Sequence, residues 1–303
     1  MAASLGARAT ILLLRLIRRK RIYASKQGLT QGIRQTRQAG PARPSAQLAR
    51  DLHIAQETFA GQDVYRLRSK RRAQSPARIL YFHGGAYVRP ITTFHWRFLA
   101  ALAHATGGEL VVPLYPLAPE SHGLAALDFA LQVHQRESAQ SGHLFLMGDS
   151  AGGGLALAVA AALRDHGMVA ARRLILLTPW VDVELPHPDA PAIEPHDPML
   201  AVVGTRLAGQ MYAGALPTSH PAISPLRGAL HGLPPMTLFA AGRDILGPDA
   251  IAFAAKAQAH GCEVDLRVEP DMVHVWPLLG FAESRRAVAA MAVVIERACH
   301  AHG

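Results

Sequence analysis

The amino-acid sequence predicts an α/β fold with a mostly parallel central sheet that helices cover on both faces. Short apolar runs, such as residues 78–82 and 174–177, alternate along the chain with longer runs of helical composition. A parallel sheet needs this alternation, because a helix usually makes the crossover between neighbouring strands. The chain has 303 residues and no visible internal repeat, so we expect one large domain or one domain with an inserted lid.

The expected elements follow one another regularly from residue 78 onward. The expected strands are residues 78–82, 109–112, 144–147, 174–177, 237–240 and 263–268. The expected helices are residues 94–106, 122–136, 155–163, 249–260 and 281–299. Upstream of these elements, residues 22–50 are rich in Gln, Gly, Pro and Arg, and we expect them to form loop with weak helix.

One long segment interrupts this order. Residues 181–235 show no regular pattern, and five prolines fall between positions 186 and 198. A loop of this length inside a compact domain is commonly a lid or a binding element. We therefore expect residues 181–215, together with an N-terminal segment of residues 1–50, to cap a site on a main domain of residues 51–303.

The positive charge of the chain is concentrated at its N-terminus. The net charge is +9, but residues 1–50 contain eleven Lys or Arg and no Asp or Glu, whereas the remainder has a net charge of −2. The main domain is therefore not expected to bind nucleic acid. The two cysteines, Cys262 and Cys299, are too few for a disulfide framework and lack metal-ligand spacing, which favours a reducing compartment such as the cytoplasm.

The N-terminal segment combines an apolar run at residues 11–17 with a basic run at residues 18–21. The apolar run is too short to span a bilayer, and most of the charge follows it, unlike in a signal peptide. Three interpretations stay open. The segment is a lid helix packed on the main domain, a peripheral helix lying on anionic lipid or another hydrophobic phase, or a disordered basic tail.

A serine lies at the sharpest predicted turn of the chain. The pattern Gly148-x-Ser150-x-Gly152 stands between the expected strand 144–147 and an Ala/Leu-rich helix. Such a strand–turn–helix holds a serine in a strained backbone with its hydroxyl exposed above the sheet, and the small flanking residues let the two elements pack closely. We therefore predict that Ser150 is the nucleophile of a hydrolase.

A serine nucleophile needs a base and an acid that orients the base. Asp244 follows the fifth expected strand and His274 follows the sixth, so both lie at the strand ends where catalytic groups collect. Two other acids are rivals: Asp249, which suits the N-cap of the next helix, and Asp271, which would have to fold back toward the histidine. The sequence favours Ser150, Asp244 and His274 as a triad.

Acyl transfer also requires hydrogen-bond donors for the negative charge that forms on the carbonyl oxygen. Gly84 and Gly85 follow the expected strand 78–82 and present N–H groups that no side chain obstructs. Ala151, directly after the predicted nucleophile, would supply a third N–H. We expect these three residues to form an oxyanion hole.

Six motifs follow one another along the chain: His83-Gly84-Gly85-Ala86-Tyr87, Tyr115-Pro116-Leu117-Ala118-Pro119-Glu120, Gly148-Asp149-Ser150-Ala151-Gly152-Gly153, Asp197-Pro198-Met199, Asp244-x-Leu246 and His274. In these motifs and their order the chain resembles the hormone-sensitive-lipase-like esterases, the bacterial carboxylesterase family often called family IV. The resemblance covers about residues 75–295. It implies an α/β-hydrolase fold, the triad and oxyanion hole given above, and a helical cap built from the N-terminus and the segment after strand 174–177.

The chain departs from this family pattern at two positions. The third glycine of the usual His-Gly-Gly-Gly motif is Ala86, which is tolerable if that residue only shapes the loop, and Pro116 stands where relatives often have Arg. The resemblance also suggests three supporting roles. His83 would brace the oxyanion loop through backbone hydrogen bonds, Asp149 would stabilise the turn, and Glu120 would hydrogen-bond the loops behind the nucleophile.

These features predict a serine carboxylesterase that hydrolyses short- to medium-chain acyl esters through an acyl-enzyme, without a metal or an organic cofactor. The alternative is a lipase or lactone hydrolase acting on hydrophobic substrates at an interface, which would use the same residues. A binding protein on this scaffold is disfavoured, because such proteins usually lose part of the triad. The expected partner is a small-molecule ester, and relatives often form homodimers through a sheet edge or the final helix.

Overall fold

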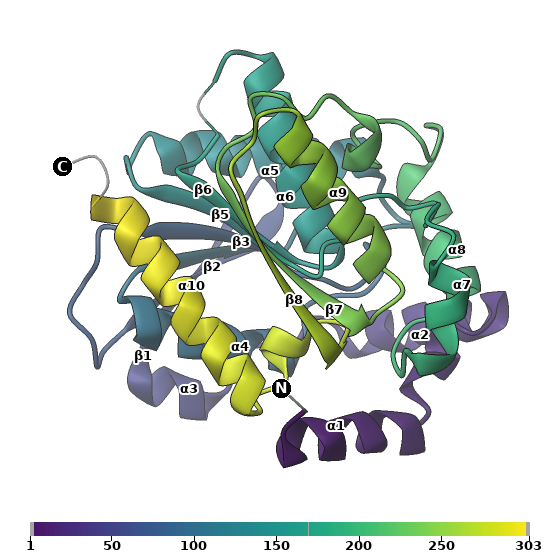
Figure 1. Cartoon of the computed structure of the whole chain (residues 1–303). Helices are drawn as coiled ribbons and strands as arrows, with labels where there is room; N and C mark the ends of the chain where they lie inside the picture. The colour runs from purple at the N-terminus through teal and green to yellow at the C-terminus, as the bar shows by residue number, and fades with distance from the viewer. Residues whose placement is uncertain (1–2, 169, 301–303) are drawn as a thin grey trace.

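The computed structural model of the chain describes residues 3–168 and 170–300, and an eight-stranded sheet forms the centre of this part (Figure 1). The strands are β1 (Leu52–Phe59), β2 (Gln62–Ser69), β3 (Arg78–Phe82), β4 (Glu109–Pro113), β5 (Leu144–Asp149), β6 (Arg173–Leu177), β7 (Met236–Arg243) and β8 (Val264–Val273). Their order across the sheet is β1-β2-β4-β3-β5-β6-β7-β8. Strands β3 to β8 run parallel, whereas β1 and β2 are antiparallel to their neighbours. The prediction of a mostly parallel sheet is confirmed.

Helices cover both faces of this sheet (Figure 1). One face carries α4 (Thr93–Thr106) and α10 (Ala282–His300), and the other carries α5 (Gly123–Ser138), α6 (Ala151–Asp165) and α9 (Gly247–Ala259). Successive side chains of a strand point to opposite faces. Leu80 and Phe82 of β3 therefore pack in the core with α5, α6 and α9, whereas Ile79 and Tyr81 pack in the core with α4 and α10.

The sheet begins earlier in the chain than the sequence predicts, since β1 and β2 form an antiparallel hairpin ahead of β3. Most side chains of β1 are exposed, because β1 is an outer strand of the sheet. A strand with so many exposed side chains lacks the apolar run by which the parallel strands are found. The hairpin turn is Ala60-Gly61, where both residues have positive φ, +47° and +79°, as a two-residue hairpin loop requires.

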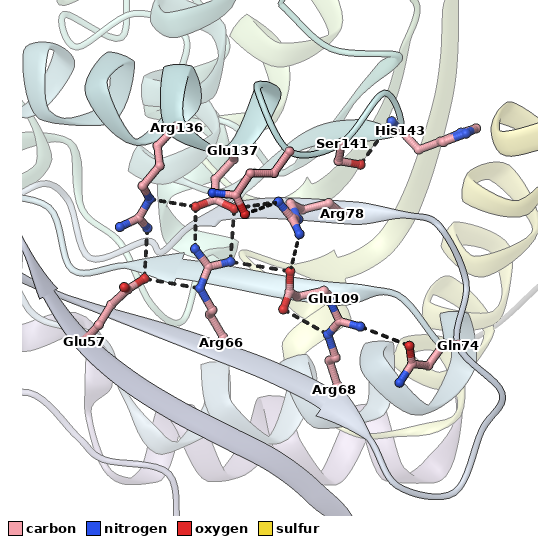
Figure 2. A network of polar contacts seen from close by, with 11 residues as sticks. Glu57, Arg66, Arg68, Gln74, Arg78, Glu109, Arg136, Glu137, Ser141 and His143 are labelled. Atoms are coloured by element: carbon pink, nitrogen blue, oxygen red, sulfur yellow. Dashed lines mark hydrogen bonds and ion pairs between the residues drawn. The ribbon is translucent and has the colours of Figure 1, made fainter.

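An ion-pair network joins this hairpin to the parallel part of the sheet (Figure 2). Arg66 of β2 has its Nη2 2.6 Å from Glu137 Oε1 on α5 and its Nε 3.2 Å from Glu57 Oε1 on β1. Arg78, at the start of β3, lies 3.2 Å from Glu137 Oε2 and 2.9 Å from Glu109 Oε2 of β4. The side chain of Glu137 is fully buried, so its charge depends on these guanidinium groups.

Two segments far apart in the sequence lie together beyond the carboxyl ends of the parallel strands (Figure 1). The first contains α1 (Leu5–Leu16), the 3-10 turn η1 (Arg19–Ile22) and α2 (Lys26–Ala39), and the second contains α7 (Ala190–Ile193), the 3-10 turn η2 (Glu194–His196) and α8 (Val202–Ala213). Helix α3 (Ala46–Asp51) follows the first segment and packs against β1. The N–H of Gly204 on α8 donates to the carbonyl oxygen of Tyr23 at 2.8 Å. A Cβ at Gly204 would lie 2.3 Å from that oxygen, so this approach requires glycine. Two further 3-10 turns are η3 (Pro225–Arg227) and η4 (Trp276–Leu278).

Helix α2 is a regular helix where the sequence predicts loop with weak helix. The hydroxyl of Ser25 caps it by accepting a hydrogen bond from the N–H of Gly28 at 3.0 Å. Only Leu29, Gly32 and Ile33 are buried, and α2 packs against α8. This tertiary contact, which a single sequence does not reveal, stabilises an otherwise polar helix. Within the described ranges, no helix is long and apolar enough to cross a bilayer.

Candidate active site

Ser150 lies in the turn between β5 and α6, at the carboxyl end of a central strand. Its backbone has φ +53° and ψ −120°, a strained conformation for a residue with a side chain. A Cβ at Gly148 would lie 2.3 Å from the backbone of Gly152, and a Cβ at Gly152 would lie 1.9 Å from the carbonyl oxygen of Phe82. The two glycines are therefore what allows so tight a turn. The N–H of Ser150 donates to Leu177 O of β6 at 2.9 Å, which fixes the turn against the sheet.

His274 and Asp244 reach Ser150 from the ends of two other strands, β8 and β7. His274 Nε2 lies 2.9 Å from Ser150 Oγ, and His274 Nδ1 lies 2.8 Å from Asp244 Oδ2. When Nδ1–H donates to the carboxylate, Nε2 is left to accept a hydrogen bond from the serine hydroxyl. All three side chains are buried. The structure thus brings the three residues of the predicted triad together in one hydrogen-bonded chain.

Two opposing effects act on the pKa of His274. Burial lowers this pKa, because a charged imidazolium is disfavoured away from water. The Asp244 carboxylate against Nδ1 raises it and prevails, so the pKa of His274 lies above its ordinary value. The imidazolium that would form when His274 takes a proton is therefore stabilised.

The two rival acids have other surroundings. Asp271 Oδ1 accepts a hydrogen bond from Arg243 Nη2 at 2.7 Å. Asp249 lies inside the first turn of α9, not at the expected N-cap, and burial raises its pKa to about 6. Asp244, by contrast, is the acid that contacts His274.

A further carboxylate, Asp197, lies beside Asp244. Its Oδ2 accepts from the N–H of Ile245 at 3.1 Å, and its Oδ1 accepts from the N–H groups of Met199 and Leu200 at 2.7 and 2.9 Å. Burial, and then the charge of Asp244, raise the pKa of Asp197. Asp197 ties the segment before α8 to the loop that carries Asp244. Its only sequence signal is the Asp-Pro-Met motif of the resemblance, and no chemical reason for that motif was visible without the fold.

The loop after β3 carries the predicted backbone N–H groups, but not all of them are free to bind a substrate oxygen. The N–H of Gly84 donates to Asp149 Oδ1 at 2.8 Å, so it is used within the protein, contrary to the prediction. Gly85 and Ala86 line the cavity beside Ser150, and in the described residues no acceptor binds their N–H groups. The N–H of Ala151 opens α6, where a helix leaves its N–H groups without intrahelical partners.

The residue that replaces the third glycine has a left-handed backbone. Ala86 has φ +54° and Tyr87 has φ +61°, values that are uncommon for residues with a Cβ. The ring of Tyr87 stacks on that of Tyr212 of α8, with centroids 3.5 Å apart and planes 5° apart. This stack holds the loop against α8 and so helps to maintain the strained conformation.

His83 and Asp149 support the same loop. His83 Nδ1–H donates to Gly84 O at 2.8 Å, and the hydroxyl of Tyr115 donates to His83 O at 2.6 Å. Burial lowers the pKa of His83 to about 4, so its ring is neutral near neutral pH. Asp149 accepts a hydrogen bond from the hydroxyl of Tyr81 in addition to the one from Gly84.

Glu120 pairs with Arg37 of α2, whereas the resemblance suggests that it hydrogen-bonds the loops behind Ser150. Its Oε2 lies 2.9 Å from Arg37 Nη2 of α2, and the same nitrogen donates to Ala118 O at 2.8 Å. The position of α2, which the sequence does not predict, brings a cation to this carboxylate. Glu120 therefore fastens α2 to the loop that follows β4.

A cavity of about 320 Å³ opens beside Ser150. Apolar side chains from several elements form much of its lining, among them Leu14, Tyr23, Met199, Leu200 and Leu278. In residues 3–168 and 170–300, no group of three or more His, Cys, Asp or Glu side chains is arranged to hold a metal ion. The site that the structure describes is thus a serine, a histidine and a carboxylate beside a largely apolar cavity.

This architecture has known counterparts. Residues 79–278 match the family model described as alpha/beta hydrolase fold. The chain belongs to the α/β-hydrolase family. A triacylglycerol lipase of Mycobacterium tuberculosis is 32% identical to it over 204 residues, which are 66% of this chain and 42% of that lipase. An acetyl-hydrolase of Streptomyces hygroscopicus is 31% identical over 222 residues, which are 71% of this chain and 74% of that protein.

A solved structure extends the comparison to the whole fold. The crystal structure of an esterase from the bacterial hormone-sensitive lipase family has a TM-score of 0.83 and 26% identity to this α/β-hydrolase, covering 99% of this chain and 100% of that one. The resemblance that the sequence motifs indicate is thereby confirmed. This α/β-hydrolase nevertheless spans less than half the length of the mycobacterial lipase that it matches.

Proposed function

We propose that this α/β-hydrolase is a serine carboxylesterase in which Ser150 is the nucleophile, His274 the general base and acid, and Asp244 the group that orients the histidine. The observation that carries the proposal is the hydrogen-bonded chain from Ser150 Oγ through His274 to Asp244 Oδ2. The names of similar proteins, a lipase, an acetyl-hydrolase and an esterase, support the same class of reaction.

The geometry supports a two-step reaction. Ser150 Oγ attacks the ester carbonyl while His274 Nε2 takes the hydroxyl proton. Asp244 stays ionised, holds the Nδ1–H and stabilises the imidazolium. His274 then gives its proton to the leaving alcohol, which departs and leaves an acyl-enzyme. Water, deprotonated by the same Nε2, hydrolyses the acyl-enzyme and restores the serine hydroxyl.

The negative charge on the carbonyl oxygen needs donors that the protein does not already use. In this proposal Gly85, Ala86 and Ala151 supply these N–H groups, while His83 and Asp149 hold the loop that carries two of them. Loss of one such donor typically costs about 10²–10³ in kcat. The N–H of Gly84 is not part of the set, since Asp149 accepts its hydrogen bond.

The size and lining of the cavity support the proposal that the acyl groups of the substrate are short to medium in length. Its volume of about 320 Å³ is at the small end of the range for ligand sites, and apolar side chains such as Leu200 and Leu278 line it. In this proposal the N-terminal residues 1–50 and the segment 181–215 form a cap whose side chains close the cavity. No metal or organic cofactor takes part in the proposed steps.

Hydrolysis of p-nitrophenyl esters, from acetate to palmitate, tests the proposal. We expect the highest kcat/KM among the short- to medium-chain esters, and we expect Ser150→Ala to lower kcat by about 10⁶ because it removes the nucleophile. A peak at palmitate would contradict the proposed chain length. Turnover by Ser150→Ala close to that of the wild type would exclude the mechanism.

A second candidate function is hydrolysis at the surface of an anionic membrane. Only Ala7 and Ile11 of α1 are buried. The apolar side chains exposed in and directly after this helix are Leu5, Leu12, Leu13, Leu16 and Ile17. The exposed arginines of the same region are Arg8, Arg15, Arg18 and Arg21. An exposed apolar helix face accompanied by basic side chains is suited to an anionic lipid surface.

Co-sedimentation with lipid vesicles tests this second function. We expect the protein to bind vesicles that contain phosphatidylglycerol, and we expect Leu12→Gln with Leu16→Gln to weaken binding by about tenfold or more, because two apolar anchors are lost. Leu124→Gln, at an exposed leucine of α5, is the matched control. Equal vesicle binding by the wild type and the double variant would exclude a membrane contact through α1.

We also propose that the protein works in a reducing compartment such as the cytoplasm, because Cys262 and Cys299 are both free thiols. Assembly as a homodimer stays a prediction that rests on the family resemblance.

A further inference from the structure

Two arginine side chains line the cavity beside Ser150. Arg19 comes from η1, at the N-terminal end of the chain, and Arg89 comes from the loop after β3. Only the fold brings them to the same cavity. Leu14, Leu278 and other apolar side chains form much of the remaining wall. A pair of positive charges therefore stands in a largely apolar cavity, close to the proposed nucleophile.

Neither guanidinium group has an anionic partner in the part of the chain that the structure describes. No hydrogen-bond acceptor or carboxylate contacts either side chain there, and the buried Nε of Arg89 has no hydrogen-bond partner. Asp149 is the one acidic residue in the cavity lining, and it already accepts hydrogen bonds from Gly84 and Tyr81. The positive charge of the cavity is not neutralised from within.

The two charges also repel each other. Burial, and then the charge of Arg89, lower the pKa of Arg19 to about 10. Holding like charges together away from water is unfavourable unless an opposite charge compensates them. Arg37, by contrast, is paired with the Glu120 carboxylate at 2.9 Å. An anion that entered the cavity would supply the negative charge that Arg19 and Arg89 lack as a partner.

The position of Arg89 is coupled to that of the oxyanion loop. The N–H of Arg89 donates to Gly85 O at 2.9 Å, and a Cβ at Gly85 would lie 2.3 Å from Arg89 O. Arg89 thus belongs to the same tight turn as a proposed oxyanion donor. A substrate whose carbonyl oxygen is bound at Gly85 would therefore lie beside the loop from which the Arg89 side chain extends into the cavity.

We propose that the cavity takes esters that carry a second, anionic group, a carboxylate or a phosphate, and that Arg19 and Arg89 bind this group together. The planar donor pattern of a guanidinium group matches the oxygen atoms of both anions, and burial strengthens the attraction. The inference rests on the proposed esterase function and specifies the class of ester on which it acts.

Two matched pairs of esters test the inference. The carboxylate pair is p-nitrophenyl hydrogen adipate and p-nitrophenyl methyl adipate, which differ only in whether the distal carboxylate is free or methylated. The phosphate pair is acetylglycerol 3-phosphate and monoacetylglycerol. For at least one pair, we expect the wild type to have a kcat/KM about tenfold or more higher for the anionic ester, as a charge-assisted hydrogen bond provides. The pair that shows this preference identifies the anion.

Arginine variants then assign the preference to its residues. We expect Arg19→Gln and Arg89→Gln each to reduce the ratio of the two kcat/KM values by about tenfold, because each removes one half of the anion site. Arg97→Gln in α4 makes the same change in net charge at an exposed position outside the cavity lining. This control should leave the ratio as it is in the wild type.

The outcomes separate this inference from the esterase function. Hydrolysis of the neutral esters that Ser150→Ala abolishes supports the esterase function alone. Equal kcat/KM values within both pairs, or a preference that survives in Arg19→Gln and Arg89→Gln, would overturn the anion site. If no ester is hydrolysed, calorimetry with Ser150→Ala decides the matter, since monoethyl adipate should bind more tightly than diethyl adipate and should lose this advantage in Arg89→Gln. Equal binding of the two would overturn the inference as well.

Discussion

His274 is held between the Asp244 carboxylate and the hydroxyl of Ser150. Asp244 Oδ2 contacts its Nδ1 at 2.8 Å, and the charge of the nearby Asp197 acts in the same direction as that of Asp244 on the pKa of His274. Both carboxylates favour the imidazolium form. In the proposed mechanism the neutral imidazole accepts the proton of Ser150, so the pKa of His274 is expected to set the lower limit of the active pH range.

The pH profile of Asp244→Asn checks this assignment. In the wild type, kcat/KM should rise with pH through an apparent pKa above the ordinary value for histidine. In Asp244→Asn, the carboxylate that mainly raises the pKa of His274 is gone, while burial still lowers this pKa. The apparent pKa should therefore fall, and the rise of kcat/KM with pH should occur at lower pH. We expect kcat to fall by about 10⁴ as well, because the histidine tautomer is no longer held. An unchanged apparent pKa in the variant would show that a group other than the His274–Asp244 pair titrates.

Ala86 carries backbone strain that a glycine would relieve. Its φ of +54° lies in the left-handed region, where a Cβ is unfavourable. Ala86→Gly should therefore raise the free energy of unfolding by up to about 1 kcal/mol, as measured by urea unfolding. Ala101→Gly, at an exposed position in α4, should have the opposite sign, about 1 kcal/mol of destabilisation, because glycine is a poor helix former. Destabilisation by Ala86→Gly would show that the alanine methyl group contributes more by packing than its backbone costs.

At the scale of elements, the antiparallel hairpin is joined to the rest of the sheet by charged side chains as well as by the buried apolar side chains of β2. Arg66 of β2 and Arg78 of β3 both contact Glu137 of α5, which has no exposed surface (Figure 2). A buried ion pair contributes little net stability compared with apolar packing, but it is costly to break from one side only. Glu137 thus joins three elements, provided that its charge is kept.

Removal of that charge should be much more harmful than removal of an exposed one. Glu137→Gln should lower the free energy of unfolding by about 3 kcal/mol or more, because the guanidinium groups lose their buried counter-charge. Glu57→Gln makes the same chemical change at a half-exposed carboxylate in the same network and should cost no more than about 1 kcal/mol. Urea unfolding of both variants measures the difference. Equal losses would mean that the burial of Glu137 has no energetic consequence.

Elements with a recognisable apolar pattern could be predicted from the sequence. Elements that depend on contacts with segments far away in the chain could not. The parallel strands have continuous apolar runs, and the order of Ser150, Asp244 and His274 along the chain follows from where those strands end. Strand β1 and helix α2 have no such pattern. Likewise, the use of the Gly84 N–H by Asp149 and the pairing of Glu120 with Arg37 depend on contacts between segments far apart in the chain.

At the scale of the whole molecule, the active-site cavity is shared by three parts of the chain. The ends of the strands carry the proposed triad, while side chains from η1 and from the segment before α8, such as Arg19 and Leu200, form part of the cavity wall. The backbone hydrogen bond from Gly204 to Tyr23 joins these two outer segments. The choice of substrate is therefore expected to depend on the N-terminal segment as much as on the triad.

The hydrogen bond between Asp149 and the N–H of Gly84 has a consequence for how the site changes over evolution. Asp149 directly precedes Ser150, so the proposed nucleophile and the loop that carries Gly85 and Ala86 are linked through one carboxylate. A displacement of either one would be transmitted to the other. We therefore expect the proposed reacting centre to move as one part, and new substrates to be accommodated more readily by mutations in the proposed cap than by changes around Ser150.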